Sequence, residues 1–200
     1  MMNGCAAKDS MNYIAGGNTS NTSFIFKTSD GGRLWTKIFV DSAKLDKSQN
    51  PPYVRYNILV YDMAYLSNGV MIVVADSTKE VKEGNISYQK ETGVLLRSVD
   101  GGQTWTAKTF GSLSDINARR IRQISMSDSL HGIVSQSISD VFSQEVRPSP
   151  ILQTTDGGLT WNETVSPDTG FVVRKIASPS AGVWIMLGWS HTYGGNVIWR

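Results

Sequence analysis

The chain has 200 residues, and its 40% apolar residues are enough to bury a core, which excludes a disordered chain. Nineteen glycines, 10% aromatic and only 18% charged residues favour short strands joined by tight turns over amphipathic helices. The net charge of +2, without a basic run, argues against a nucleic-acid partner, and the single cysteine excludes an internal disulfide or a multi-cysteine zinc site.

Four segments in chain order read as a strand, a polar turn and a second strand. They span residues 5–15, 62–74, 123–134 and 175–186. After each comes a short apolar strand that ends in a long polar residue, over residues 24–27, 94–97, 150–153 and 197–200. The repetition predicts a series of antiparallel three- or four-stranded units.

After the third strand, the first three units continue into an eight-residue repeat with the pattern Thr/Ser-x-Asp-Gly-Gly-x-x-Trp. Its marked positions are Thr28, Asp30, Gly32 and Trp35, then Ser98, Asp100, Gly102 and Trp105, then Thr154, Asp156, Gly158 and Trp161. Glycine accepts positive φ, the aspartate carboxylate can accept backbone amides, and the Ser or Thr hydroxyl can bond the same hairpin. The tryptophan offers an apolar surface to a neighbouring strand. We therefore predict a structural turn.

The unit predicts an all-β fold, a β-propeller of four-stranded antiparallel blades with about three complete blades and a partial fourth. We expect one propeller segment over residues 1–200, with blades over about 1–41, 57–112, 119–167 and 170–200. Because rings use about four to eight blades, this is expected to be a fragment of a six- to eight-bladed ring, with self-association through unpaired blade edges. The alternatives are two copies that complete one ring, or an open stack.

The repeat resembles the Asp-box, or BNR, repeat of sialidases, xyloglucanases, sortilins and the photosystem II stability and assembly factors. Its double-glycine form is most similar to the assembly-factor and xyloglucanase propellers. The resemblance implies that these turns stabilise the fold on the face opposite the ligand site. It also implies an extracytoplasmic or secreted location, although residues 1–5 lack the charged and apolar regions of a signal peptide.

Long insertions are predicted at the end of each blade opposite the repeat. Strand parity puts there residues 41–56 and 111–119 as crossovers, and 77–92 and 136–149 as loops between second and third strands. Arginines and tyrosines dominate many binding sites, so this rim is the candidate site. Its candidate binding residues are Tyr53, Arg55, Tyr56, Lys82, Tyr88, Arg119, Arg120 and Arg147.

The expected function is a non-catalytic scaffold that binds a protein or carbohydrate partner through this rim. No catalytic residue is assigned, and neither a cofactor nor a metal is expected, because His131 and His191 lie too far apart in the pattern to form a pair. A membrane span is not expected either, since the longest apolar run, 70–75, is far below about 20 residues. The alternative is a fragment of a sialidase- or xyloglucanase-like glycoside hydrolase, although the sialidase Arg-Ile-Pro or Arg-Leu-Pro signature is missing.

Overall fold

The computed structural model describes residues 2–19, 22–42, 44–46, 53–55, 58–83, 86–110, 118–139, 151–164 and 171–200. Within them, every regular element is a β-strand, so the predicted all-β class is confirmed. The first sheet runs β1 (Met2–Ala7), β2 (Tyr13–Asn18), β3 (Thr22–Thr28) and β4 (Thr36–Ser42). The second runs β7 (Ile58–Tyr65), β8 (Met71–Glu83), β9 (Ile86–Ser98) and β10 (Thr106–Phe110).

The two remaining large sheets repeat the same meander. The third contains β11 (Ala118–Met126), β12 (Gly132–Ser139), β13 (Ile151–Thr154) and β14 (Asn162–Thr164). The fourth contains β15 (Phe171–Ser180), β16 (Val183–Ser190) and β17 (Gly195–Trp199). A small pair, β5 (Lys44–Asp46) and β6 (Tyr53–Arg55), lies between the first two sheets in the chain. All neighbouring strands are antiparallel, as in propeller blades.

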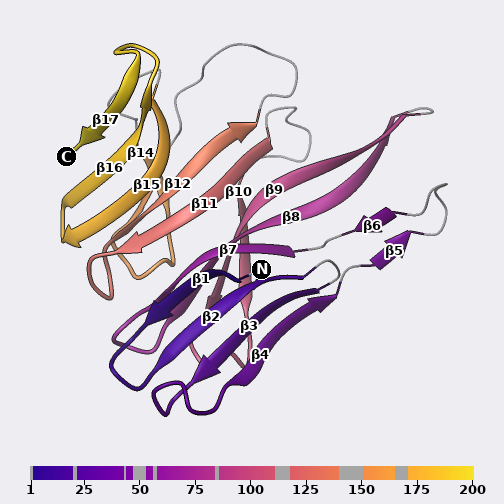
Figure 1. Ribbon diagram of the computed structural model, residues 1–200, viewed down its shortest axis with the longest axis vertical. Coiled ribbons are helices and arrows are strands. Elements are labelled where there is room, and N and C mark those ends of the chain that lie inside the picture. Colours follow the sequence, from indigo (N-terminus) through magenta and orange to yellow (C-terminus); the bar gives the residue numbers. More distant parts are fainter. Residues whose placement is uncertain are drawn as a thin grey trace.

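The sheets stack in chain order, each with its first strand beside the first strand of the next (Figure 1). The side chain of Asn3 in β1 donates to the Val60 carbonyl in β7 at 2.7 Å. The amide of Ile124 in β11 donates to the Asp62 carboxylate in β7 at 3.1 Å. β11 in turn contacts β15. The first strands β1, β7, β11 and β15 therefore form the inner row of the stack.

Each of the first three sheets buries one apolar face against the sheet that follows it in the chain. We call this side of any sheet its forward face and the opposite side its rear face. The second strand of each of the first three sheets places an isoleucine there, and Ile14, Ile72 and Ile133 are at most 1% exposed. The third strands contribute Ile25, Leu95 and Ile151, which are also buried. At about 25 cal/mol per Å² of apolar area, this repeated burial is the main stabilisation between sheets.

The expectation of a loop over residues 77–92 is wrong. β8 and β9 continue as paired strands of 13 residues each, with register running from Met71 opposite Ser98 to Glu83 opposite Ile86. The segment mixes charged residues with β-branched and aromatic ones, and the latter are common in strands. Its high charge made it resemble a solvated loop in the sequence.

The other predicted insertions are partly strands as well. Residues 41–56 include the end of β4 and the hairpin of β5 and β6. Residues 118–119 open β11, and residues 136–139 complete β12. The remainder of these segments lies outside the described residues.

The three Asp-Gly-Gly turns join the third and fourth strands of the first three sheets, and the second turn shows their construction. The Ser98 hydroxyl donates to Asp100 at 2.8 Å and accepts the Gly102 amide at 2.9 Å. The Asp100 carboxylate accepts the Thr104 amide at 2.9 Å, and the Trp105 indole donates to the Gly102 carbonyl at 3.1 Å. The equivalent bonds recur at residues 28–35 and 154–161. The predicted hydrogen bonds of hydroxyl and carboxylate are therefore present.

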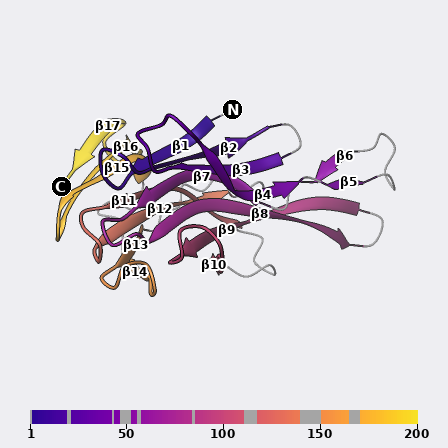
Figure 2. The ribbon, with the colours of Figure 1, turned by 90° about the horizontal axis from the view of Figure 1, so that it is seen from below.

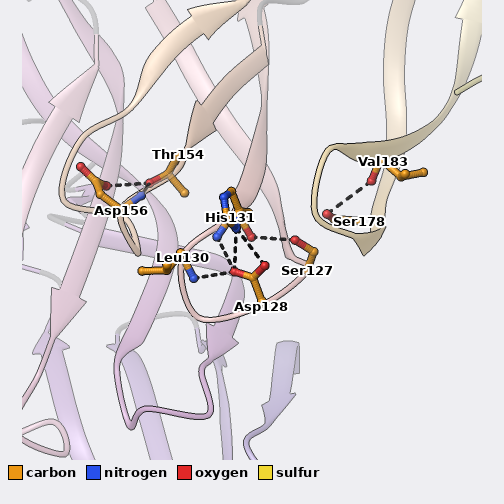
Figure 3. A network of polar contacts seen from close by, with 8 residues as sticks. All are labelled: Ser127, Asp128, Leu130, His131, Thr154, Asp156, Ser178 and Val183. Carbon is orange, nitrogen blue, oxygen red and sulfur yellow. Dashed lines mark hydrogen bonds and ion pairs between the residues drawn. The ribbon is translucent and has the colours of Figure 1, made fainter.

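A second polar turn, between the first and second strands of a sheet, is hydrogen bonded to the Asp-Gly-Gly turn of the same sheet. In the third sheet, the Asp128 carboxylate accepts the amides of Leu130 and His131 at 2.7 Å each, as Figure 3 shows. The Leu130 carbonyl then accepts the Gly157 amide of the Asp-Gly-Gly turn at 2.9 Å. The first sheet repeats this, with Asp9 capping its turn and the Gly31 amide bonding the Met11 carbonyl. The two kinds of turn thus form one end of the stack, which we call the turn end.

Candidate binding site

The opposite end of the sheets, the loop end, carries two hairpins that project from the stack. Figures 1 and 2 both show β8 and β9 extending past the other strands, with β5 and β6 on the same side. Between the Ser77–Thr92 pair and the Glu83–Ile86 pair, the ribbon advances six residues, or about 20 Å at the usual rise per residue. A projecting ribbon of this length offers a surface that the compact sheets lack.

Most of the predicted binding residues lie in strands at this end. Tyr53 and Arg55 are in β6, Lys82 is in β8, Tyr88 is in β9, and Arg119 and Arg120 open β11. Tyr56 and Arg147 lie outside the described residues. The gathering of these residues on a single binding rim stays a prediction.

The sequence analysis did not predict one contact of an arginine, which joins the second and third sheets. A bulge in β11 carries Arg122, whose guanidinium lies 3.3 Å from the Asp76 carboxylate in β8. The same guanidinium stacks 3.9 Å from the ring centroid of Tyr61 in β7. Asp76 is fully buried, whereas the Arg122 side chain is 30% exposed. Buried charges require such pairing, so this contact fastens the two sheets and leaves part of the guanidinium open to water.

Gln136 adds a second polar side chain at this level. It pairs with Ile121 across β11 and β12, so it lies on the rear face of the third sheet, toward the face that carries Asp76. Gln136 is 2% exposed, and within the described part of the chain neither of its side-chain polar atoms has a hydrogen-bond partner. Arg122, Asp76 and Gln136 thus form a polar layer beside the apolar contact between the second and third sheets. A sequence signal existed, since Asp76 directly follows the apolar run 70–75.

At the turn end, the carboxylates of Asp100 and Asp156 accept hydrogen bonds within their own turns. Hydrogen bonds from the Thr104 hydroxyl and amide, and from the Ser98 hydroxyl, hold the pKa of Asp100 well below its usual range. For Asp156, desolvation acts upward, but hydrogen bonds led by that of the Thr160 hydroxyl outweigh it and lower the pKa to about 2. Such carboxylates stay ionised and acceptor-only at neutral pH, so they are poorly suited to act as general acids.

Two hollows at the turn end recur between successive sheets. One, of about 250 Å³, lies between the first Asp-Gly-Gly turn, β4 and Gly101; the other, of about 180 Å³, lies between β9, β10 and Gly158. Beside the second hollow, the Arg97 guanidinium donates to the Gly157 carbonyl of the next sheet at 3.1 Å. Each hollow is bounded by the third and fourth strands of one sheet and by an Asp-Gly-Gly glycine of the next sheet, so these hollows are products of sheet stacking.

The described residues contain no group of three or more His, Cys, Asp or Glu side chains placed to hold a metal ion. His131 instead lies 2.8 Å from Asp128 in its own turn. A search of the described residues finds no helix long and apolar enough to cross a membrane.

Stacked antiparallel meanders, with tight turns at one end and long connections at the other, define this chain as a segment of β-propeller. No protein-family model matches the chain, and no curated protein sequence matches it. Among solved structures, it is similar to YCF48 bound to D1 peptide, with 16% identity and a TM-score of 0.55 over 100% of this chain. It is also similar to the GH74 xyloglucanase from Xanthomonas campestris, with 11% identity and a TM-score of 0.53 over 94% of this chain.

The chain spans 51% of the YCF48 chain and 27% of the xyloglucanase chain. At these identities, the likeness shows the fold alone. The predicted propeller class is confirmed.

Proposed function

We propose that this chain is a non-catalytic scaffold that binds a protein partner through its loop end. Its three turns are Asp-box repeats, and its blades follow the limits 1–41, 57–112, 119–167 and 170–200. The observation that carries the proposal is the projection of two hairpins from the loop end, with the Asp-Gly-Gly turns confined to the opposite end. Binding residues commonly lie on extensions held by a rigid scaffold.

Two further observations support a structural role for the turn end and a binding role for the loop end. The turn-end hydroxyls and carboxylates of Ser98 and Asp100 are hydrogen bonded within their own turn. In addition, YCF48, to which this chain is similar in fold, was solved with a bound peptide. An extended peptide could pair with a hairpin edge or lie between the hairpins.

The test uses peptides selected from a phage-displayed random library on the wild-type chain. Replacing both Arg119→Ala and Arg120→Ala is expected to raise the Kd about tenfold or more, because arginines often dominate binding energy. The melting temperature should change by much less than the binding energy, because the proposal assigns these two side chains to partner contact and not to packing. The matched control, Lys8→Ala with Arg33→Ala, removes equal charge at the turn end. Equal weakening by the control, or unchanged affinity in the test variant, contradicts the proposal.

The similarity to the xyloglucanase favours one alternative, a carbohydrate-binding or glycoside-hydrolase segment. Hydrolysis would need two carboxyl groups at a defined separation across the scissile bond. Incubation with xyloglucan and with a sialoside, followed by measurement of released sugar, separates the candidates. Sugar release by the wild-type chain would overturn the non-catalytic proposal, and binding on a glycan array without release would replace the protein partner with a carbohydrate.

A further inference from the structure

The forward face of the fourth sheet is apolar and open to solvent. Ile198 on β17 is 69% exposed, and Leu187, which pairs with it on β16, is 41% exposed. Ile185 and Val172 on the same face are each 37% exposed. Four large apolar side chains on one side of a three-stranded sheet form a patch of the kind that marks an interaction surface.

Three of these exposed residues, Ile185, Leu187 and Ile198, occupy positions that are buried in the first three sheets. Ile198 pairs with Leu187 as Leu95 pairs with Val74, and Leu95 is only 3% exposed. Ile185 is the third residue after a positive-φ glycine, as is Ile72, which is 1% exposed. The fourth sheet thus presents the same contact surface that the first three sheets use to hold the sheet that follows. Its occupant is expected to be another sheet of this kind.

The same chain carries a candidate for that occupant at its other end. On the rear face of the first sheet, Phe24 and Phe26 stack with ring centroids 5.3 Å apart. Val40, which pairs with Phe24, is 47% exposed, and Met2 on the same face is 59% exposed. In the later sheets, the corresponding rear positions are Leu96 and Leu152, which are buried against the preceding sheet.

We propose that a second copy of this chain docks the rear face of its first sheet onto the forward face of the fourth sheet. The contact is head-to-tail, so it can be made twice, and two copies then close a ring of eight sheets. A ring of that size is at the upper end of the usual range of about four to eight blades. Head-to-tail contacts close into rings when the rotation between copies allows it.

The first test measures mass in solution by light scattering over a range of protein concentrations. The wild-type chain is expected to reach twice the chain mass. Ile198→Asp on the forward face and Val40→Asp on the rear face should each give a monomer, because an unpaired carboxylate is costly in an apolar contact. Leu159→Asp is the matched control, since Leu159 is 61% exposed in the third Asp-Gly-Gly turn and should leave the dimer intact.

Mixing the two monomeric variants tests the head-to-tail geometry. Each variant keeps the face that the other lacks, so an equimolar mixture is expected to regain a dimer with one intact contact. A contact between two forward faces would instead survive Val40→Asp. Far-UV circular dichroism and melting of each variant separate loss of association from loss of folding.

Cys5 supplies a readout that does not depend on mass. It is the only cysteine of the chain, it is exposed, and its pairing with Ala15 places it on the rear face of the first sheet. Maleimide labelling of Cys5 should slow several-fold at dimer-forming concentrations, and Ile198→Asp should abolish that protection. A wild-type monomer at all concentrations, a dimer that persists in Ile198→Asp, or an open series of larger assemblies overturns the proposal.

Discussion

Replacing Ser98 with alanine removes the hydroxyl at the centre of the second Asp-Gly-Gly turn. Ser98 is 1% exposed, and its hydroxyl accepts the Gly102 amide while it donates to Asp100. Gly102 is itself buried, so its amide would lose its partner without gaining water. An unsatisfied buried group costs about 1–3 kcal/mol, and a lost hydrogen bond adds about 0.5–1.5 kcal/mol. We therefore expect Ser98→Ala to lower the free energy of unfolding by about 1.5–4.5 kcal/mol.

Urea unfolding followed by tryptophan fluorescence, at one fixed protein concentration, measures this change as a shift of midpoint with an unchanged slope. Ser98→Thr is the matched control, because Thr28 and Thr154 hold the same position in the other two turns. It should retain the stability to within about 1 kcal/mol. If Ser98→Ala costs under about 0.5 kcal/mol, or if Ser98→Thr costs as much as Ser98→Ala, the assignment of this hydroxyl is wrong.

Three further predictions concern backbone, charge and pH. Gly102→Ala should destabilise by about 1–3 kcal/mol more than Gly69→Ala in urea titrations, because both have positive φ but only the Gly102 Cβ would meet a neighbouring side chain, at 2.6 Å. Arg122→Met should cost about 3 kcal/mol by removing the guanidinium that pairs with buried Asp76, and adding Asp76→Asn should recover part of it; a double variant less stable than Arg122→Met refutes this. The lowered pKa of Asp156 stabilises the fold above pH 3.8, so the advantage of wild type over Asp156→Asn should shrink as pH falls from 3.8 to about 2, and a constant advantage contradicts it.

The repeated elements could be predicted from the sequence because their chemistry is local. In each Asp-Gly-Gly turn, the hydroxyl, carboxylate and glycines lie within five residues, so spacing alone predicts which groups meet. Alternating apolar residues then predicted the strands before each turn, and their repetition predicted the stacked sheets.

Features that depend on contacts between sheets could not be read in the same way. Arg122 and Asp76 lie on different sheets, and only the bulge in β11 and the stacking of the sheets bring them together. The ribbon of β8 and β9 was mistaken for a loop because residues 78–91 are rich in charge and show no regular alternation of apolar and polar residues. The sequence could not predict that Ile198 is exposed, because the residues around it follow the same pattern as those around buried Leu95.

Shortening the projecting hairpin tests the central claim most directly. Ser77 and Thr92 are a cross-strand pair, so residues 78–91 can be replaced by an Asn-Gly turn without disturbing the strands that pack in the second sheet. The measurement is the Kd of the library-selected peptide for this shortened chain, with its melting temperature as the control for folding. We predict that binding weakens at least tenfold while melting is nearly unchanged. Full affinity in a folded, shortened chain would contradict the claim that the loop end binds the partner.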